Sequence, residues 1–175
     1  MSQVGVLALQ GAFSKHRDML SLLGIESFEL RYPEQLEIAS GLIMPGGEST
    51  TMWRLMEEKE LIQPLKKFEK PIFGTCAGLI LLCRLGRLEV QCERNAYGRQ
   101  SASFEASFPS SFGMISGLFI RAPRIKNVFS SVEVLARYNE EPVLVKQGNV
   151  LASTFHPELT HDTKVHGLFR DLLEK

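Results

Sequence analysis

The sequence predicts an α/β fold of three layers, in which a parallel sheet is covered by helices on both faces and continues into an antiparallel extension. Over residues 1–80, short apolar runs alternate with helical patterns, as in consecutive βαβ units. After that point short strand-like runs dominate, until a helical pattern returns near the end of the chain. The 175 residues contain no repeat, linker or low-complexity segment, so we expect a single domain over residues 1–175.

Four segments in the first part of the chain are expected as strands, and the first of them is a continuous apolar run of the kind found in buried parallel strands. They cover residues 4–9, 25–31, 41–44 and 71–73. A helix is expected over residues 12–23, where apolar side chains recur at helical spacing until Gly24 ends it. A short helical piece joins the second and third strands. Glu48 and the hydroxyl residues after it begin a further helix, and another follows the fourth strand.

The second part of the chain consists of short runs with strand character, separated by Gly, Pro, Asn and Ser. We expect strands over residues 87–94, 101–108, 117–121, 132–138, 142–147 and 150–155. Asn139-Glu140-Glu141 and Gly148-Asn149 have the composition of hairpin turns, which indicates an antiparallel arrangement. A final helix is expected over residues 164–173.

The composition excludes several classes of protein. Lys+Arg and Asp+Glu number 20 each, so no basic surface indicates binding of nucleic acid or of an anionic membrane. No apolar run approaches the ~20 residues of a membrane span. The chain opens directly into a strand without the layout of a signal peptide, and its three cysteines do not suggest a disulfide framework. We therefore expect a cytoplasmic protein.

The segment Gly74-Thr75-Cys76-Ala77-Gly78 joins a predicted strand to a predicted helix and places a cysteine at the apex of the turn. A nucleophile elbow requires this pattern, because only small flanking residues let the strand and the helix approach each other. The helix N-terminus favours the thiolate form of a cysteine, and the N–H of Ala77 is free to face an oxyanion.

His156-Pro157-Glu158 supplies the other two members of a Cys-His-Glu triad. On an extended strand, residues two apart point to the same side, so the carboxylate of Glu158 can orient the imidazole of His156. The imidazole then accepts the proton of the Cys76 thiol. The alternative is a buried, inert cysteine beside a structural His-Pro turn.

A second crevice is expected at Pro45-Gly46-Gly47-Glu48, where another strand of the sheet ends. Two glycines let the backbone approach a ligand closely, although a plain strand-to-helix turn has the same composition. The segment lacks the pattern of a phosphate-binding loop. Residues 94–100 gather arginine and amide groups in a loop that suits bidentate binding of a carboxylate, unless the loop is merely solvated. Arg121 ends a predicted strand, and an ordinary surface ion pair is the alternative there.

The remaining histidines and cysteines carry no predicted chemistry. His161 and His166 are badly spaced for a shared metal on a helix, and His16 is expected on a solvated helix face. Cys83 and Cys92 lack the spacing of a zinc site and are expected to be packing residues. We expect no metal and no cofactor.

The two catalytic motifs resemble those of the class I glutamine amidotransferases. Six segments narrow the resemblance to the glutaminase subunits of pyridoxal 5′-phosphate synthase, and they occur in that family's order over nearly the whole chain. They are residues 6–11, 45–51, 73–78, 93–95, 119–123 and 155–160.

The resemblance implies a three-layer, flavodoxin-like fold with a parallel or mixed sheet, and a glutaminase that converts L-glutamine to glutamate and ammonia. The ammonia is expected to pass to a barrel subunit that builds pyridoxal 5′-phosphate, within a complex of the two. The matched positions make Cys76 the nucleophile, His156 the acid and base, and Glu158 its orienting group. The positions that match the glutamine-binding residues are Gly46, Gly47, Glu48, Arg94, Ile120 and Arg121, and the N–H groups of Gly47 and Ala77 match the oxyanion hole.

The resemblance is broken at residues 83–87, where the family normally carries a longer loop. Two other functions remain open. One is a glutaminase subunit for a different synthase, such as the one that makes the imidazole ring of histidine. The other is a catalytically silent binding module, which has no need of Cys76, His156 and Glu158 together.

Overall fold

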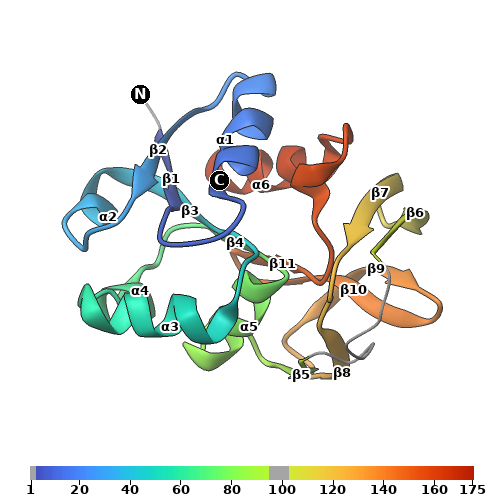
Figure 1. Cartoon of the computed structure of the whole chain (residues 1–175). Helices are drawn as coiled ribbons and strands as arrows, with labels where there is room; N and C mark the ends of the chain where they lie inside the picture. Colours follow the sequence, from blue (N-terminus) through green and yellow to red (C-terminus); the bar gives the residue numbers. More distant parts are fainter. Residues whose placement is uncertain (1–2, 95–102) are drawn as a thin grey trace.

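The computed structural model describes residues 3–94 and 103–175, and these form three layers around one large sheet (Figure 1). The order of the nine strands in this sheet is β2-β1-β3-β4-β11-β10-β9-β6-β7. Five of them are mutually parallel: β2 (Glu26–Leu30), β1 (Gln3–Leu7), β3 (Ala39–Met44), β4 (Ile72–Thr75) and β11 (Val150–Ser153). This is the strand order of flavodoxin-like folds, as expected.

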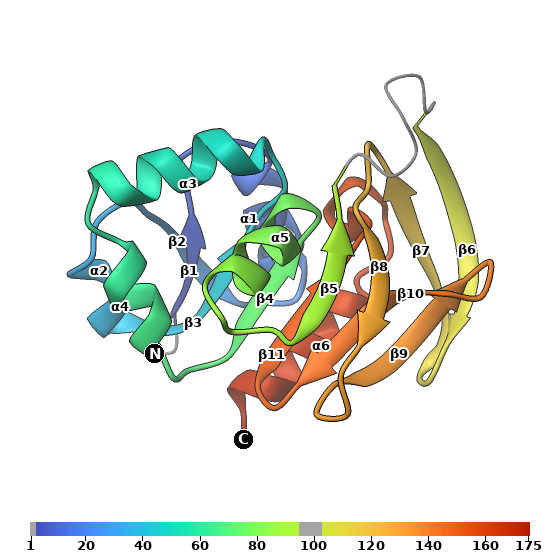
Figure 2. The same cartoon turned by 90° about the horizontal axis from the view of Figure 1, so that it is seen from below.

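The antiparallel half of the sheet continues from β11. It consists of β10 (Glu141–Gln147), β9 (Glu133–Tyr138), β6 (Phe104–Ser110) and β7 (Gly113–Phe119). A separate antiparallel ribbon pairs β5 (Val90–Glu93) with β8 (Arg124–Val128), and Figure 2 shows it beside α5 (Ala77–Arg84). The α/β fold with an antiparallel extension is therefore confirmed.

Helices cover both faces of the parallel half (Figure 1). One face carries α1 (Phe13–Leu22) and α6 (Lys164–Leu173), and the other carries α2 (Gln35–Ile38), α3 (Ser49–Glu58), α4 (Ile62–Lys67) and α5. Successive strand residues alternate between the two cores, as the period of a strand requires. On β4, for example, Ile72 packs on the α3 and α5 side, whereas Phe73 packs on the α1 and α6 side. No helix of the described residues is long and apolar enough to cross a membrane.

Several element predictions are confirmed and a few are wrong. The last helix has the predicted bounds, and the strand expected at residues 150–155 joins the parallel half as β11, with every residue buried. The strand expected at 117–121 is instead β7, which ends at Phe119, because Arg121 has a left-handed φ of 44° that cannot continue a strand. Helix α4 and strand β8 were not predicted. The loop at 94–100 falls mostly outside the described residues.

The short connection at residues 83–87 closes as a regular helix end. Gly86 adopts φ of 73°, its N–H donates to the carbonyl of Cys83, and the N–H of Arg87 donates to the carbonyl of Leu82. These two bonds define a Schellman motif, which satisfies carbonyls that the end of α5 leaves free. The chain then runs directly into β5. Cys83 and Cys92 pack against the core as expected, and their side chains hydrogen-bond each other.

Candidate active site

The nucleophile elbow is formed where β4 meets α5, and Cys76 lies at its apex with φ of 51° and ψ of −107°. This left-handed backbone is strained for a residue with a side chain. The N–H of Cys76 is held at 2.9 Å by the carbonyl of Ser153 on β11. A Cβ on Gly78 would lie 1.9 Å from the carbonyl oxygen of Met44, and one on Gly74 would lie 2.5 Å from Leu82. The two glycines therefore allow the close approach of strand and helix that the motif predicts.

His156 and Glu158 meet beside the elbow. Nδ1 of His156 lies 2.6 Å from Oε1 of Glu158, and both side chains are buried. The backbone of His156 exchanges two hydrogen bonds with the backbone of Leu118 on β7, and these bonds fix the position from which the imidazole projects. The expected extended geometry is wrong, because Glu158 lies in the 3₁₀ turn η1 (Pro157–Leu159). That turn, and not the alternation of a strand, brings the carboxylate back to the imidazole.

The triad side chains differ in their ionisation. Burial by itself lowers the pKa of His156, but hydrogen bonds with Cys76 and Glu158 outweigh it and raise this pKa to about 10. Burial raises the pKa of the Glu158 carboxyl, yet its contacts with His16 and His156 outweigh burial and lower it. At neutral pH the site therefore holds a protonated imidazole beside a carboxylate, next to the Cys76 sulfur.

A cavity of about 560 Å³ opens onto the triad at the carboxyl ends of β1, β3 and β4. Its lining includes every predicted site residue except Glu158, whose buried carboxylate contacts the lining residue His156. These lining residues are Cys76, His156, Gly46, Gly47, Glu48, Ala77, Arg94, Ile120 and Arg121. The sulfur of Cys76 lies 3.9 Å from the carbonyl oxygen of Ile120. The two predicted crevices are thus one cavity, as expected for strands that end at the same edge of a sheet.

Glu48 holds the entrance of this cavity in place. Its carboxylate accepts hydrogen bonds from the N–H groups of Thr50 and Thr51 and from the Thr51 hydroxyl, and these bonds lower its pKa to about 2. Arg94 donates to the Thr50 hydroxyl at 2.9 Å and lies 3.6 Å from the Glu48 carboxylate. The predicted binding residues Glu48 and Arg94 are therefore already joined through the start of α3.

Gln10 is a cavity residue to which the sequence assigned no role. Its side-chain oxygen accepts the N–H of Glu48 at 2.8 Å and so ties the end of β1 to the Gly46-Gly47 turn. Leu159 lines the cavity as well and is 37% exposed. The sequence did contain a signal for Gln10, because this polar residue follows a buried strand directly. Ligands bind at the carboxyl edge of a parallel sheet, where such residues lie.

His16 is wrongly predicted as a solvated residue. It is fully buried on α1, beside His166 of α6 and close to Glu158. The sequence contains a signal for this position, because Phe13, His16 and Leu20 lie three and four residues apart on one face of the helix. A histidine counts as polar in such a pattern, and so the buried position was missed.

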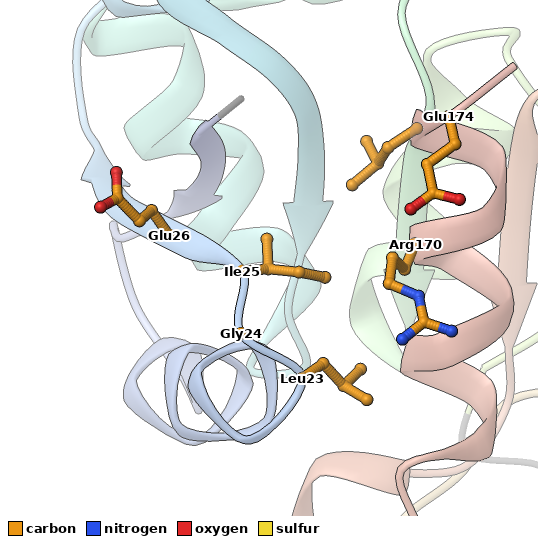
Figure 3. A pocket seen from close by; sticks show the side chains of 7 residues that line it. Leu23, Gly24, Ile25, Glu26, Arg170 and Glu174 are labelled. Carbon is orange, nitrogen blue, oxygen red and sulfur yellow. The ribbon is translucent and has the colours of Figure 1, made fainter. Parts of the chain in front are cut away.

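A second cavity, of about 650 Å³, lies between the end of α1 and α6 (Figure 3). The side chains of Leu23 and Ile25 point across it towards Arg170 of α6 and Glu174, which directly follows this helix. It is found where β2 begins, which is the opposite edge of the parallel sheet from Cys76. It contains none of the predicted site residues, and therefore the cavity at Cys76 is the candidate active site.

Comparisons with known proteins point to one family. The profile of the SNO glutamine amidotransferase family matches residues 6–175. Pyridoxal 5′-phosphate synthase subunit PdxT of Desulforamulus reducens is 46% identical over 186 residues, covering 98% of this chain and 99% of the relative. The PdxT of Thermosipho africanus is 45% identical, and the match covers 99% of this chain and 100% of the relative.

Solved structures share the fold. A structure described as a glutamine amidotransferase superposes with a TM-score of 0.93 at 47% identity, covering 98% of this chain and 99% of the other. PurLQS from Thermotoga maritima has a TM-score of 0.81 at 18% identity, covering 98% of this chain and 99% of the other, and this likeness shows the fold alone.

Proposed function

Since this chain belongs to the SNO glutamine amidotransferase family, we propose that it is the glutaminase subunit of a pyridoxal 5′-phosphate synthase. It forms a single glutamine amidotransferase domain and hydrolyses L-glutamine to glutamate and ammonia, which passes to a barrel subunit. The observation that carries the proposal is that Cys76 and His156 line one cavity at the carboxyl edge of the sheet, with the buried carboxylate of Glu158 bound to His156. A protein of this kind works in the cytoplasm.

The reaction begins from a thiolate of Cys76 beside the protonated His156. The thiolate attacks the side-chain amide carbon of glutamine, and the C–N bond breaks as His156 gives its proton to the leaving ammonia. A glutamyl thioester remains on Cys76. Water then attacks the thioester while His156 accepts a proton, the C–S bond breaks, and glutamate leaves with the thiolate restored. Glu158 orients His156 and stabilises its charged form throughout.

The oxyanion of each tetrahedral intermediate is bound by the N–H groups of Gly47 and Ala77. Ala77 is the first residue of α5, so its N–H has no partner within the helix and adds to the positive end of the helix dipole. Gly46 and Gly47 admit the glutamine closely because they have no side chain. Such preorganised donors contribute about 3 kcal/mol each to catalysis in comparable enzymes.

The backbone of glutamine is held by Glu48, Arg94, Ile120 and Arg121, which line the same cavity as Cys76. Arg94 and Arg121 supply the positive charge for the α-carboxylate. The carboxylate of Glu48 is occupied by the start of α3, and so Glu48 acts mainly through the turn that it fixes.

The isolated chain is expected to be a weak glutaminase whose kcat rises when the barrel subunit binds. A glycine turn has low barriers between conformers, and a docked partner selects the one that points the Gly47 N–H at the oxyanion. The effect belongs in kcat because the oxyanion hole is used most in the transition state. Full turnover without the partner would instead favour a stand-alone hydrolase.

The test follows glutamate release by the chain with and without its barrel subunit. Cys76→Ala is expected to lower the rate by about 10⁴-fold or more, because the covalent nucleophile is lost. Cys83→Ala and Cys92→Ala are matched controls and are expected to keep most of the activity. Near-normal hydrolysis by Cys76→Ala would refute the triad.

The identity of the synthase is tested separately. With amide-labelled ¹⁵N-glutamine, the label should appear in pyridoxal 5′-phosphate made by the complex. Glutamate release without transfer of the label would point to the alternative of another synthase, and a wild-type chain without any glutaminase activity would point to a silent module.

A further inference from the structure

Three groups behind the triad form a buried chain of hydrogen bonds that the proposed chemistry does not use. Nδ1 of His16 lies 2.9 Å from Nε2 of His166, and Nε2 of His16 lies 3.1 Å from the hydroxyl of Thr75. The same Nε2 is 3.5 Å from Oε1 of Glu158, the oxygen that contacts His156. Both histidines have no exposed surface. They are contributed by α1 and α6, residues 150 apart in sequence.

Both histidines are neutral at the pH at which the triad works. Burial lowers the pKa of His16, against the opposing effect of Glu158. Burial and the neighbouring His16 lower the pKa of His166 to about 3. Each ring therefore carries a single N–H, and the question is which nitrogen holds it.

The surroundings select one arrangement of these two protons. A carboxylate only accepts hydrogen bonds, so Nε2 of His16 must carry the N–H that faces Glu158 and Thr75. Nδ1 of His16 is then bare and accepts from Nε2–H of His166. Nδ1 of His166 is left as a bare lone pair, and it is indeed a buried nitrogen without a partner among the described residues. The reverse arrangement would bury an unpaired N–H and set a lone pair against the carboxylate, which is more costly.

We propose that His16 and His166 are positioning residues of the glutaminase, forming a neutral relay that directs one N–H at Glu158 and Thr75. The relay holds the carboxylate in its ionised form and fixes the strand end directly before Cys76. This inference rests on the proposed glutaminase function. The second oxygen of Glu158, Oε2, is buried without a partner among the described residues, so the contacts with His156 and His16 both fall on Oε1. Among the described residues, the titratable groups that act on this carboxylate are His156, His16 and, more weakly, His166.

Removal of the relay has a defined consequence for pH dependence. A neutral His16 presents the positive end of its N–H to Glu158, and its removal leaves burial, which raises the pKa of this carboxyl, less opposed. A larger fraction of the enzyme then holds a neutral carboxyl group at a given pH. A neutral Glu158 stabilises the charged His156 less well, so the acid limb of the pH profile of kcat/KM moves to higher pH. The titratable groups that face His16 are Glu158, His156 and His166: Glu158 raises the pKa of His16, whereas His156 lowers it and His166 stays neutral.

The test compares His16→Leu with His16→Gln in the complex with the barrel subunit. Gln places an amide N–H near the position of Nε2, whereas Leu fills the space without a donor. We expect His16→Leu to lower kcat by ~10- to 100-fold, the range found for residues that orient a reacting group from behind, with little change in KM for glutamine. His16→Gln should restore much of the rate and the wild-type pH profile. His166→Phe should act in the same direction as His16→Leu, but more weakly.

Two results would overturn the relay. One is a normal rate and pH profile in His16→Leu. The other is an equal fall of kcat in the Leu and Gln variants that is explained by an equal fall of their Tm. A wild-type complex that releases no glutamate would refute the proposed function. The relay can then still be tested by a measurement that does not depend on activity. ¹⁵N NMR of the imidazole rings should show Nε2–H on His16 and His166, and the pKa of His156 should fall in His16→Leu. An Nδ1–H on either ring would overturn the assignment whatever the activity.

Discussion

Gly46→Ala should damage catalysis selectively, because the glycine lies directly against the imidazole of His156. A Cβ at this position would lie 2.3 Å from Cε1, 3.0 Å from Nδ1 and 3.3 Å from Nε2 of the ring. Ordinary contacts of a Cβ begin at 3.4 Å. The ring must therefore retreat by about 1 Å, since the three nearest atoms all belong to this one side chain.

The ring has little freedom to make this movement without loss. Its Nδ1 is bound to Glu158 at 2.6 Å, and its backbone is paired with Leu118. Misplacing a catalytic group by about 1 Å costs on the order of 10²-fold in rate, which is ~2.7 kcal/mol of transition-state stabilisation. We expect a fall of that size in kcat with a smaller change in KM, since the clash is with the acid and base rather than with the wall that binds the substrate backbone.

Steady-state kinetics of the complex, combined with the Tm of the variant, test this expectation. Gly167→Ala is the matched control, because a Cβ there meets no atom within 4 Å and the residue lies in α6. Its activity should be normal. A Gly46→Ala enzyme with wild-type kcat would show that the His156 ring moves freely, and the geometry assigned to the triad would then be wrong.

Two further predictions concern the histidines and their partner. His156→Asn should lower kcat nearly as far as loss of the nucleophile. Glu158→Gln should lower kcat less, because it weakens the orientation of the base without removing it. Equal losses in the rate of glutamate release would mean that Glu158 does more than orient His156. His166 becomes protonated below about pH 6.5 in the unfolded chain, but only below about pH 3 in the folded chain. Between these two pH values the free energy of unfolding should therefore fall as the pH is lowered, by ~1.4 kcal/mol per pH unit from this group. Urea unfolding of His166→Gln between these limits should show a shallower pH dependence, and an unchanged slope would contradict the buried neutral state.

The sequence predicted the parallel half well because its signals are local. Apart from the partly exposed edge strand β2, the strands there are almost wholly buried and appear as short apolar runs. The elbow needs its two glycines within five residues of sequence. The residues of the candidate site follow strand ends, so the sheet itself brings them together. Their catalytic roles remain predictions until the variants are measured.

The elements that were missed lack such local signals. Strand β8 reads Arg-Ile-Lys-Asn-Val after a proline, and its pairing with β5 depends on residues distant in sequence. Helix α4 contains Pro64, which is tolerated because the first turn of a helix needs no N–H from that residue. The buried His16 was missed for a different reason, since its role depends on His166 and Glu158 from the other end of the chain.

The spacing between Cys76 and His156 is set by the pairing of β4 with β11. Thr75 is in register with Ser153, and the carbonyl of Ser153 holds the N–H of Cys76. His156 follows three residues after Ser153 and is fixed by Leu118 from the antiparallel half. The strand that joins the two halves of the sheet therefore places both reacting groups, and a slip of one residue in its register would turn every side chain to the opposite face. The shortened connection after α5 lies at the far end of that helix from Cys76, and hence it leaves this spacing intact.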